Sequence, residues 1–330
     1  MQYGQLKRRE FISLIGGVAA WPIVAGAQQL PMPLIGYLSS ESPDSDLFRL
    51  TAFRQGLTEV GYVEGRNVSI ECRWAKHEFA KLSALAAELV QGRVDVMVTP
   101  GLPSTLAAKA ATGRIPVIFV VGIDPVQVGL VASLNRPEGN LTGFNQVNGE
   151  LGAKGIEVLH ELFPSAMTIG LLENPRNPVA EFTTKDVLAA ANVIGLTIQR
   201  LYASTDGEID TVFINLLRAG TPALLVSNDI FFNGQINRFV ALAEHHRIAA
   251  IYPSREYVLA GGLMSYGASL KDTYRQIALY TSRILKGSKP AELPVQQQTR
   301  IEFAINVKAA KALGLNFPLS LLGRADEVIE

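Results

Sequence analysis

The chain has 330 residues, 48% of them hydrophobic and 18% charged, and its formal net charge at pH 7 is +0. This length favours two lobes over a single core, and the composition is that of a well-buried globular protein. Because there is no basic excess to hold a phosphate backbone, we expect no nucleic-acid partner. Cys72 is the only cysteine, which excludes an intramolecular disulfide.

Residues 1–27 have the pattern of an export signal. Lys7-Arg8-Arg9 is a cationic start, residues 11–24 form a short apolar run, and Ala25-Gly26-Ala27 fits a cleavage site. The run is too short, and too interrupted by glycine and proline, to span a membrane. We therefore expect cleavage after Ala27 and a periplasmic protein that is not integral to the membrane. Arg8-Arg9 is also typical of a twin-arginine signal, so the choice between that route and general secretion stays open.

The rest of the chain contains one strand-helix-strand pattern twice. A strand around Gly36 leads to a helix that stops at Gly61, and a strand around Gly170 leads to a helix that stops at Gly195. The interval from the first glycine to the second is 25 residues in each copy. In the first copy Asp44 or Ser45 is the expected helix cap. Apolar residues then recur at threes and fours in both helices, which predicts one buried stripe on each. The stripes consist of Leu47, Leu50, Phe53, Leu57 and Val60, and of Val179, Phe182, Val187, Ala190 and Ile194.

Further strands follow each copy as nearly continuous apolar runs, which is typical of parallel strands covered on both faces. They are expected at residues 94–99 and 115–121, and at 223–228 and 248–252. A glycine-rich strand at 261–267, a helix at 270–285, a strand at 301–305 and a helix ending at Gly314 complete the chain. Strands that alternate with helices predict an α/β fold with two doubly wound parallel-sheet lobes.

The elements at the end of the chain exceed what two simple copies need, so we interpret them as crossovers that form a hinge. The expected first lobe is 31–144 plus 266–289, and the expected second lobe is 145–265 plus 290–330.

Ligands of open parallel sheets bind beyond the carboxyl ends of the strands, which places the candidate contacts just after each strand. In the first lobe these are Ser39, Ser40, Thr99, Gly101, Ser104 and Asp124. In the second lobe they are Asn174, Asn228, Asp229, Ser254 and Arg255, with Tyr266 on a crossing strand.

Several of these candidates also have an ordinary structural interpretation. Ser104 opens a helix that suits an anionic group, or it is only an N-cap. Asp124 binds a ligand ammonium group, or it forms a turn that caps a helix at 128–134. Asp229 and Arg255 contact the ligand or are ordinary loop residues. Tyr266 forms a wall of the cleft or packs in the core.

The histidines do not indicate a metal site. His245 and His246 are adjacent on one predicted helix, so their side chains point roughly 100° apart, and no further ligand follows at a suitable spacing. The chain also has no nucleophile elbow, phosphate-binding loop or dinucleotide-binding glycine motif. We therefore expect no metal, no cofactor and no catalytic activity.

At this level of detail the sequence resembles a known family: exported type I periplasmic substrate-binding proteins of ABC importers, in the tryptophan/tyrosine-type branch. The resemblance covers essentially the whole chain after the signal. Its most specific segments are residues 53–57 with 61–67, 124–126 with 129–131, 136–143, 261–267, and 284–287 with 293–295. The loop at 99–103 has fewer glycines and threonines than the family pattern, and Asn228-Asp229-Ile230 stands where an Asp-Pro pair is expected.

The resemblance implies a monomer with a Venus-flytrap fold that closes on a small solute and delivers it to an ABC permease driven by its ATPase. Our main hypothesis is therefore a periplasmic protein that captures a small polar or zwitterionic molecule, such as an amino acid, by hinge closure. An alternative is a sensor that presents its closed form to a membrane receptor kinase. An exported enzyme is a third hypothesis, which the lack of a catalytic constellation disfavours.

Overall fold

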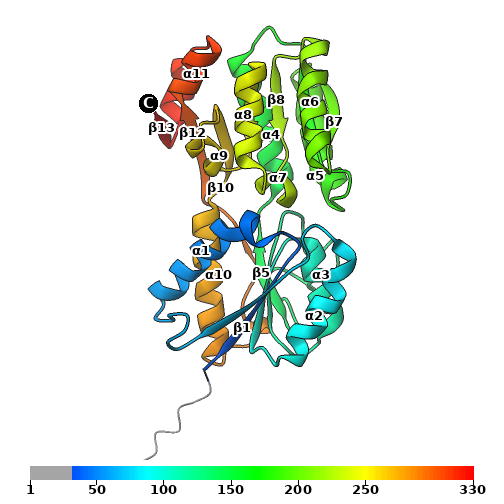
Figure 1. Cartoon of the computed structure of the whole chain (residues 1–330), viewed down its shortest axis with the longest axis vertical. Coiled ribbons are helices and arrows are strands. Elements are labelled where there is room, and N and C mark those ends of the chain that lie inside the picture. The colour runs from blue at the N-terminus through cyan, green and yellow to red at the C-terminus, as the bar shows by residue number, and fades with distance from the viewer. Residues whose placement is uncertain (1–31) are drawn as a thin grey trace, which may run out of the picture. The chain divides into compact units, whose positions relative to one another are not determined.

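The strands of the chain lie in two separate sheets, each covered by helices (Figure 1). The structure is a computed structural model that describes residues 32–330, so the expected signal and its cleavage site lie outside the described residues. The first sheet has the order β11-β5-β4-β3-β1-β2, and all its pairs are parallel. Its strands are β1 (Leu34–Ser39), β2 (Ser69–Trp74), β3 (Val96–Pro100), β4 (Val117–Val121), β5 (Leu141–Asn145) and β11 (Gln296–Gln297).

Helices cover both faces of the first sheet. On one face, α1 (Pro43–Glu59) and α10 (Leu270–Leu285) bury apolar side chains such as Phe53 and Ile277. On the other, α2 (Leu82–Gln91) and α3 (Leu102–Ala111) pack through small residues such as Ala86 and Ala108. The short turns η1 (Phe79–Lys81) and η2 (Pro290–Glu292) complete this lobe.

The second sheet has the order β13-β12-β10-β9-β8-β6-β7. Its pairs are parallel except for β10 with β12. Its strands are β6 (Thr168–Glu173), β7 (Thr197–Tyr202), β8 (Ala223–Val226), β9 (Ala249–Tyr252), β10 (Met264–Ala268), β12 (Ile301–Asn306) and β13 (Glu327–Ile329).

The second sheet also carries helices on both faces. One face packs against α4 (Asn148–Leu162), α5 (Ala180–Val193), α11 (Val307–Leu313) and α12 (Leu319–Arg324). The other packs against α6 (Asp206–Ala219), α7 (Ile230–Asn233), α8 (Ile236–His246) and α9 (Arg255–Leu259).

The duplication predicted from the sequence is present in the topology. The order β2-β1-β3-β4-β5 in the first sheet repeats as β7-β6-β8-β9-β10 in the second, so the predicted pair of doubly wound lobes is confirmed. Gly61 and Gly195 end the paired helices with φ of +91° and +75°, a region that favours glycine.

Local details of three predicted helices differ from expectation. The N-cap of α1 is Ser42, which forms a capping box with Ser45 ahead of the expected start. Leu47 and Phe182 are exposed rather than part of the buried stripes. Residues 128–134 form turns instead of a helix, because the segment from Pro125 folds back through turn hydrogen bonds.

The chain passes between the lobes in three described segments. Residues 145–148 join β5 to α4, residues 268–270 join β10 to α10, and residues 297–301 join β11 to β12. These three segments are the crossovers between the two lobes.

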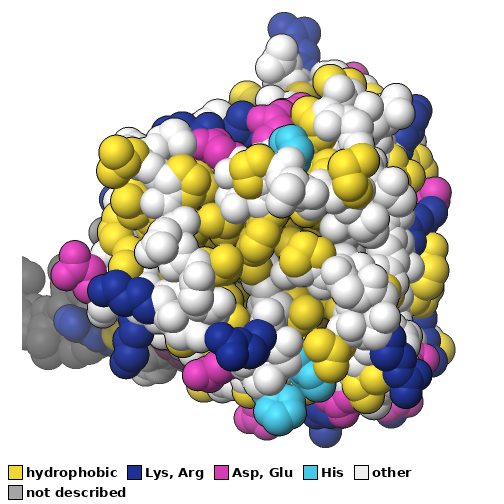
Figure 2. Space-filling view, turned by 90° about the horizontal axis from the view of Figure 1, so that it is seen from above, with side chains coloured by type: hydrophobic (Ala, Val, Ile, Leu, Met, Phe, Trp, Pro, Cys, Tyr) yellow, Lys and Arg dark blue, Asp and Glu magenta, His cyan; other side chains and the backbone are white. Residues whose placement is uncertain are grey.

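The surface of one end carries no continuous basic area. In Figure 2 hydrophobic side chains gather near the middle of the view, and basic and acidic side chains alternate around them. Within residues 32–330, no helix is both long enough and apolar enough to cross a membrane.

Candidate ligand-binding site

One cavity is lined by residues from both lobes. From the first lobe, the carboxyl ends of β3, β4 and β5 contribute Gly101, Gly122 and Gln146. From the second, the end of β8 contributes Asn228 and Asp229. This is the position at which doubly wound sheets bind ligands, and the cavity has room for about 80 Å³.

The first lobe contributes a buried arginine to the lining of this cavity. Arg49 on α1 lines the cavity but is only 4% exposed, and its Nη1 donates to Asp46 Oδ1 at 3.1 Å. Burial by itself lowers the pKa of Arg49, but Asp46 and then Tyr274 and Glu41 raise it on balance. The bond to Asp46 uses one of five N–H donors, so Arg49 can hold an anionic ligand group as well.

The second lobe presents a buried carboxylate to the same cavity. Asp229 caps α7, and its oxygens accept hydrogen bonds from Asn174 Nδ2 at 3.0 Å, Asn177 Nδ2 at 2.7 Å and the backbone N–H of Phe231 at 2.9 Å. Burial raises the pKa of Asp229, and these hydrogen bonds partly offset that effect. Donors directed at the carboxylate favour its ionised form, which is the form that binds a cation.

Amide side chains line the same cavity. Asn228 Nδ2 donates to Asn148 Oδ1 at 3.0 Å, and Asn233 Nδ2 donates to Asn228 Oδ1 at 3.0 Å. Gln146 Oε1 lies 3.5 Å from Asn228 Nδ2. Because amides both donate and accept, this group can match a polar ligand without adding net charge.

The lobes also touch beside the cavity, at Glu41. Its Oε2 accepts a hydrogen bond from the Ser45 hydroxyl at 2.9 Å, and its Oε1 lies 3.5 Å from His77 Nδ1. Burial raises the pKa of Glu41 to about 8, although Arg49 opposes the shift. Gly234 from the second lobe lies against this pair, since a Cβ built on it would be 2.7 Å from Ser45 Cβ and 3.1 Å from Glu41 Oε2.

A second contact between the lobes lies near the first. The rings of His77 and Phe231 meet edge to face with centroids 5.4 Å apart. Burial lowers the pKa of His77, so the neutral imidazole is favoured at this contact. The structure is therefore closed on this side of the cavity.

Of the residues that the sequence singled out, Gly101, Asn228 and Asp229 line the cavity. Asn174 does not line it but holds Asp229 in place. Tyr266 lines a smaller adjoining space that also includes Asn228.

The other predicted residues have structural surroundings. Ser39 accepts a hydrogen bond from the backbone of Glu41, and Thr99 bonds to Thr105. Ser104 donates to Pro100 O at 2.6 Å, while the N-cap of α3 is Gly101. The remaining four are Ser40 and Ser254, which are buried, Asp124, which accepts from Val126 N in a turn, and Arg255, which pairs with Glu327.

Six residues with polar side chains line the cavity without having been singled out from the sequence: Arg49, Gln146, Asn148, Asn177, Asn233 and Tyr274. Arg49 lies on a helix, and nothing in the helical pattern distinguishes a buried arginine from an exposed one. The rule that ligands bind beyond the carboxyl ends of parallel strands, here called the strand-end rule, would have indicated Gln146, which directly follows β5. Within residues 32–330, no group of three or more His, Cys, Asp or Glu side chains is placed to hold a metal ion.

The fold and this cavity define a two-lobed α/β binding protein. Comparison with known proteins adds the family: residues 41–329 match the model described as ABC transporter substrate binding protein. This match covers most of the chain, so the chain belongs to that family of substrate-binding proteins and is not an enzyme.

Individual relatives agree with this assignment. The chain is 25% identical over 263 residues to a tyrosine-binding protein of Clostridioides difficile, covering 80% of this chain and 75% of the relative. Among solved structures, it is similar to an ABC domain from Streptococcus pneumonia in complex with L-Trp, with a TM-score of 0.79, 26% identity, and coverage of 90% of this chain and 99% of the other. It is also similar to a conserved domain protein from Vibrio cholerae, with a TM-score of 0.81, 25% identity and the same coverage.

Proposed function

We propose that this protein captures a zwitterionic amino acid in the periplasm and delivers it to an ABC permease driven by its ATPase. One observation carries the choice of ligand: a buried guanidinium from the first lobe, Arg49, and a buried carboxylate from the second, Asp229, line one cavity. An α-carboxylate pairs with the first and an α-ammonium with the second, and such charge-assisted hydrogen bonds are the strong ones. The names of the tyrosine-binding and L-Trp-bound relatives support the same class of ligand.

The two charges also give a reason for closure. A ligand that needs both Arg49 and Asp229 binds fully only when the lobes are together, so it favours the closed form by its differential affinity for that form. The moving parts in this proposal are the two lobes, which the segments 145–148, 268–270 and 297–301 connect. We further propose that the protein acts as a monomer after cleavage of the signal following Ala27.

Calorimetry with matched ligands tests whether binding needs both charged groups of the amino acid. We expect L-tryptophan to bind, and tryptamine, which lacks the carboxylate, and indole-3-propionate, which lacks the ammonium, to bind about 10- to 150-fold more weakly. That range corresponds to roughly 1.5–3 kcal/mol for one charge-assisted hydrogen bond. Equal affinity for all three compounds, or no affinity for any amino acid, would contradict the proposal.

Two variants test which residue binds which end of the ligand. Arg49→Gln is expected to weaken the binding of L-tryptophan about 10- to 150-fold but to leave the binding of tryptamine unchanged, because tryptamine has no carboxylate for Arg49 to hold. Asp229→Asn is expected to act in the opposite way, weakening tryptamine but not indole-3-propionate. Arg275→Gln is the matched control, since Arg275 lies on α10 in an exposed pair with Glu59. Equal effects of Arg49→Gln on both ligands would show that the loss is structural.

A further inference from the structure

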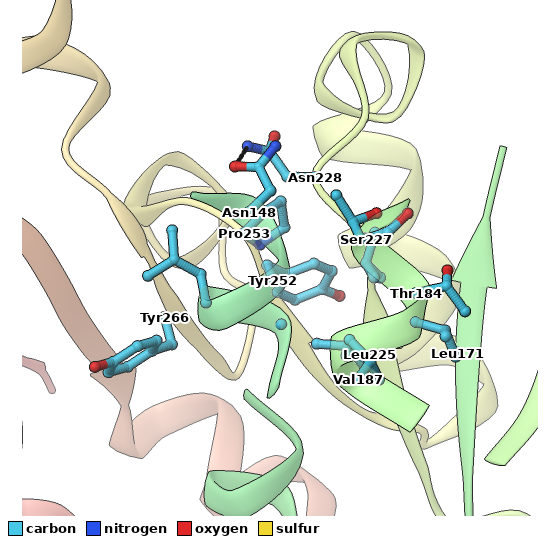
Figure 3. Close-up of a pocket in the computed structure, with 14 residues that line it drawn as sticks. Asn148, Leu171, Thr184, Val187, Leu225, Ser227, Asn228, Tyr252, Pro253 and Tyr266 are labelled. Carbon is cyan, nitrogen blue, oxygen red and sulfur yellow. Dashed lines mark hydrogen bonds between the residues drawn. The ribbon is translucent and has the colours of Figure 1, made fainter. Parts of the chain in front are cut away.

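A second, smaller space adjoins the cavity and lies within the second lobe. We call it the inner chamber and define its apolar wall by Leu171, Val187, Leu225 and Tyr266. These residues come from β6, α5, β8 and β10, so one lobe alone builds the wall. Figure 3 shows Leu225, Val187 and Leu171 below the space and Tyr266 to one side of it.

The inner chamber meets the ligand cavity at a pair of amides. Asn148 and Asn228 line both spaces, and the hydrogen bond between them appears as a dashed line in Figure 3. Gly122 of the first lobe lies against Asn148, since a Cβ built on Gly122 would be 1.9 Å from Asn148 Nδ2. Asn148 itself stands where the chain passes from β5 to α4.

The charged groups and the apolar wall occupy different compartments. Arg49 and Asp229 line the cavity and not the inner chamber, whereas Leu171, Val187 and Leu225 line the chamber and not the cavity. An amino acid has the same division between a charged head group and a side chain. A side chain that enters the chamber gains by leaving water in proportion to its apolar area.

We propose that the inner chamber receives an apolar side chain of the amino-acid ligand and that the Asn148–Asn228 pair is its gate. The proposal rests on the zwitterionic ligand proposed above. In this structure the chamber has room for about 30 Å³, which is enough for one or two water molecules. Because a side chain needs more room than that, it enters when Asn228 turns away from Asn148 and the chamber merges with the ligand cavity, and the chamber wall then sets which side chains fit.

Ser227 and Val187 allow the size of the chamber to be changed in both directions. Ser227 is half-buried at the end of β8, and Ser227→Leu fills the space. Val187→Ala enlarges it from the α5 side. Val193→Ala is the matched control on the same helix, because Val193 is 84% exposed, and Ser83→Leu is the matched control on an exposed position of α2.

Calorimetry with alanine, leucine, phenylalanine and tryptophan measures the preference for side-chain size. For Ser227→Leu we expect the affinity for tryptophan to fall at least about 10-fold relative to the affinity for alanine. This is the scale of one misplaced methylene group in an apolar pocket. For Val187→Ala we expect the preference to move towards larger side chains. The controls are expected to match the unmodified protein. An unchanged order of affinities in both chamber variants, with melting temperatures retained, overturns the proposal.

Indole separates this inference from the proposed head-group contacts, because it has neither an ammonium nor a carboxylate group. We expect it to shift NMR signals from the chamber in the unmodified protein and in Asn148→Ala, but not in Ser227→Leu. If no amino acid binds and indole binding is lost only in Ser227→Leu, the result supports the chamber proposal and contradicts the zwitterionic ligand. If tryptophan binding depends on Arg49 while Ser227→Leu binds indole as the unmodified protein does, the result supports the zwitterionic ligand and contradicts the chamber proposal. Weaker indole binding by Asn148→Ala contradicts the gate.

Discussion

Replacing Gly234 by alanine tests whether closure of the lobes is coupled to ligand binding. The new Cβ would lie 2.7 Å from Ser45 Cβ, whereas carbon atoms in favourable contact lie roughly 3.5–4.0 Å apart. Ser45 Cβ is fixed on the first turn of α1, so it cannot rotate out of the way. The lobes must therefore separate by about 1 Å at this contact before they accept the methyl group.

The effect on affinity follows from the usual cost of overpacking. Inserting a methyl group into a closely packed contact typically costs about 1–3 kcal/mol, which corresponds to a Kd about 5- to 150-fold higher. The open form has no such contact to lose, and Gly234 has a φ of −78° that alanine adopts without strain. We therefore expect the ligand-free melting temperature to stay the same or to rise slightly.

Calorimetry with L-tryptophan and a thermal melt of the ligand-free protein measure both quantities. Gly207→Ala is the matched control, since a Cβ at that position would meet nothing within 4 Å. A Kd for Gly234→Ala equal to that of the control, with both proteins folded, would refute the coupling between this contact and the bound state.

Three further variants address stability and the limits of the site. The pKa of Glu41 is raised to about 8 in the folded chain, above the ordinary value of about 4.3. Between these two pH values the folded form therefore retains a proton that the unfolded form has lost. The free energy of unfolding should then fall as the pH rises from about 4.3 to about 8. Urea titrations at several pH values should show a smaller fall in Glu41→Gln. Gly267→Ala should lower the unfolding free energy by about 1–3 kcal/mol or more, because its Cβ would lie 1.7 Å from Pro253 O. Arg255→Gln breaks a half-exposed ion pair with Glu327, so we expect the unfolding free energy to fall by less than about 1 kcal/mol and the Kd to stay the same. A large rise in Kd would instead place Arg255 in the ligand-binding site.

The fold was accessible from the sequence because its signals are local. Strands such as β3 and β8 are unbroken apolar runs, and Gly61 and Gly195 mark helix ends at the same distance from the first glycine of each copy. The start of α1 was predicted too late because Ser42 and Ser45 both have the chemistry of a cap, and only the capping box of the structure assigns them. The periodicity of the helix did not show that Leu47 faces solvent.

The site was accessible only in part. The strand-end rule indicates Asn228 and Asp229 because their place depends on the topology alone. It does not indicate Arg49, whose burial depends on α10 packing against α1 across a separation of more than two hundred residues. Ser104 and Asp124 have side chains that suit both a ligand and a local turn, and sequence does not separate these roles.

A crystal structure of residues 28–330 with a bound aromatic amino acid would show the contacts of the ligand head group themselves. We expect a ligand carboxylate about 2.7–2.9 Å from an Arg49 nitrogen, a ligand ammonium at the Asp229 carboxylate, and Gly234 in contact with Ser45. A ligand bound outside this cavity, or one whose head group meets neither Arg49 nor Asp229, would contradict it.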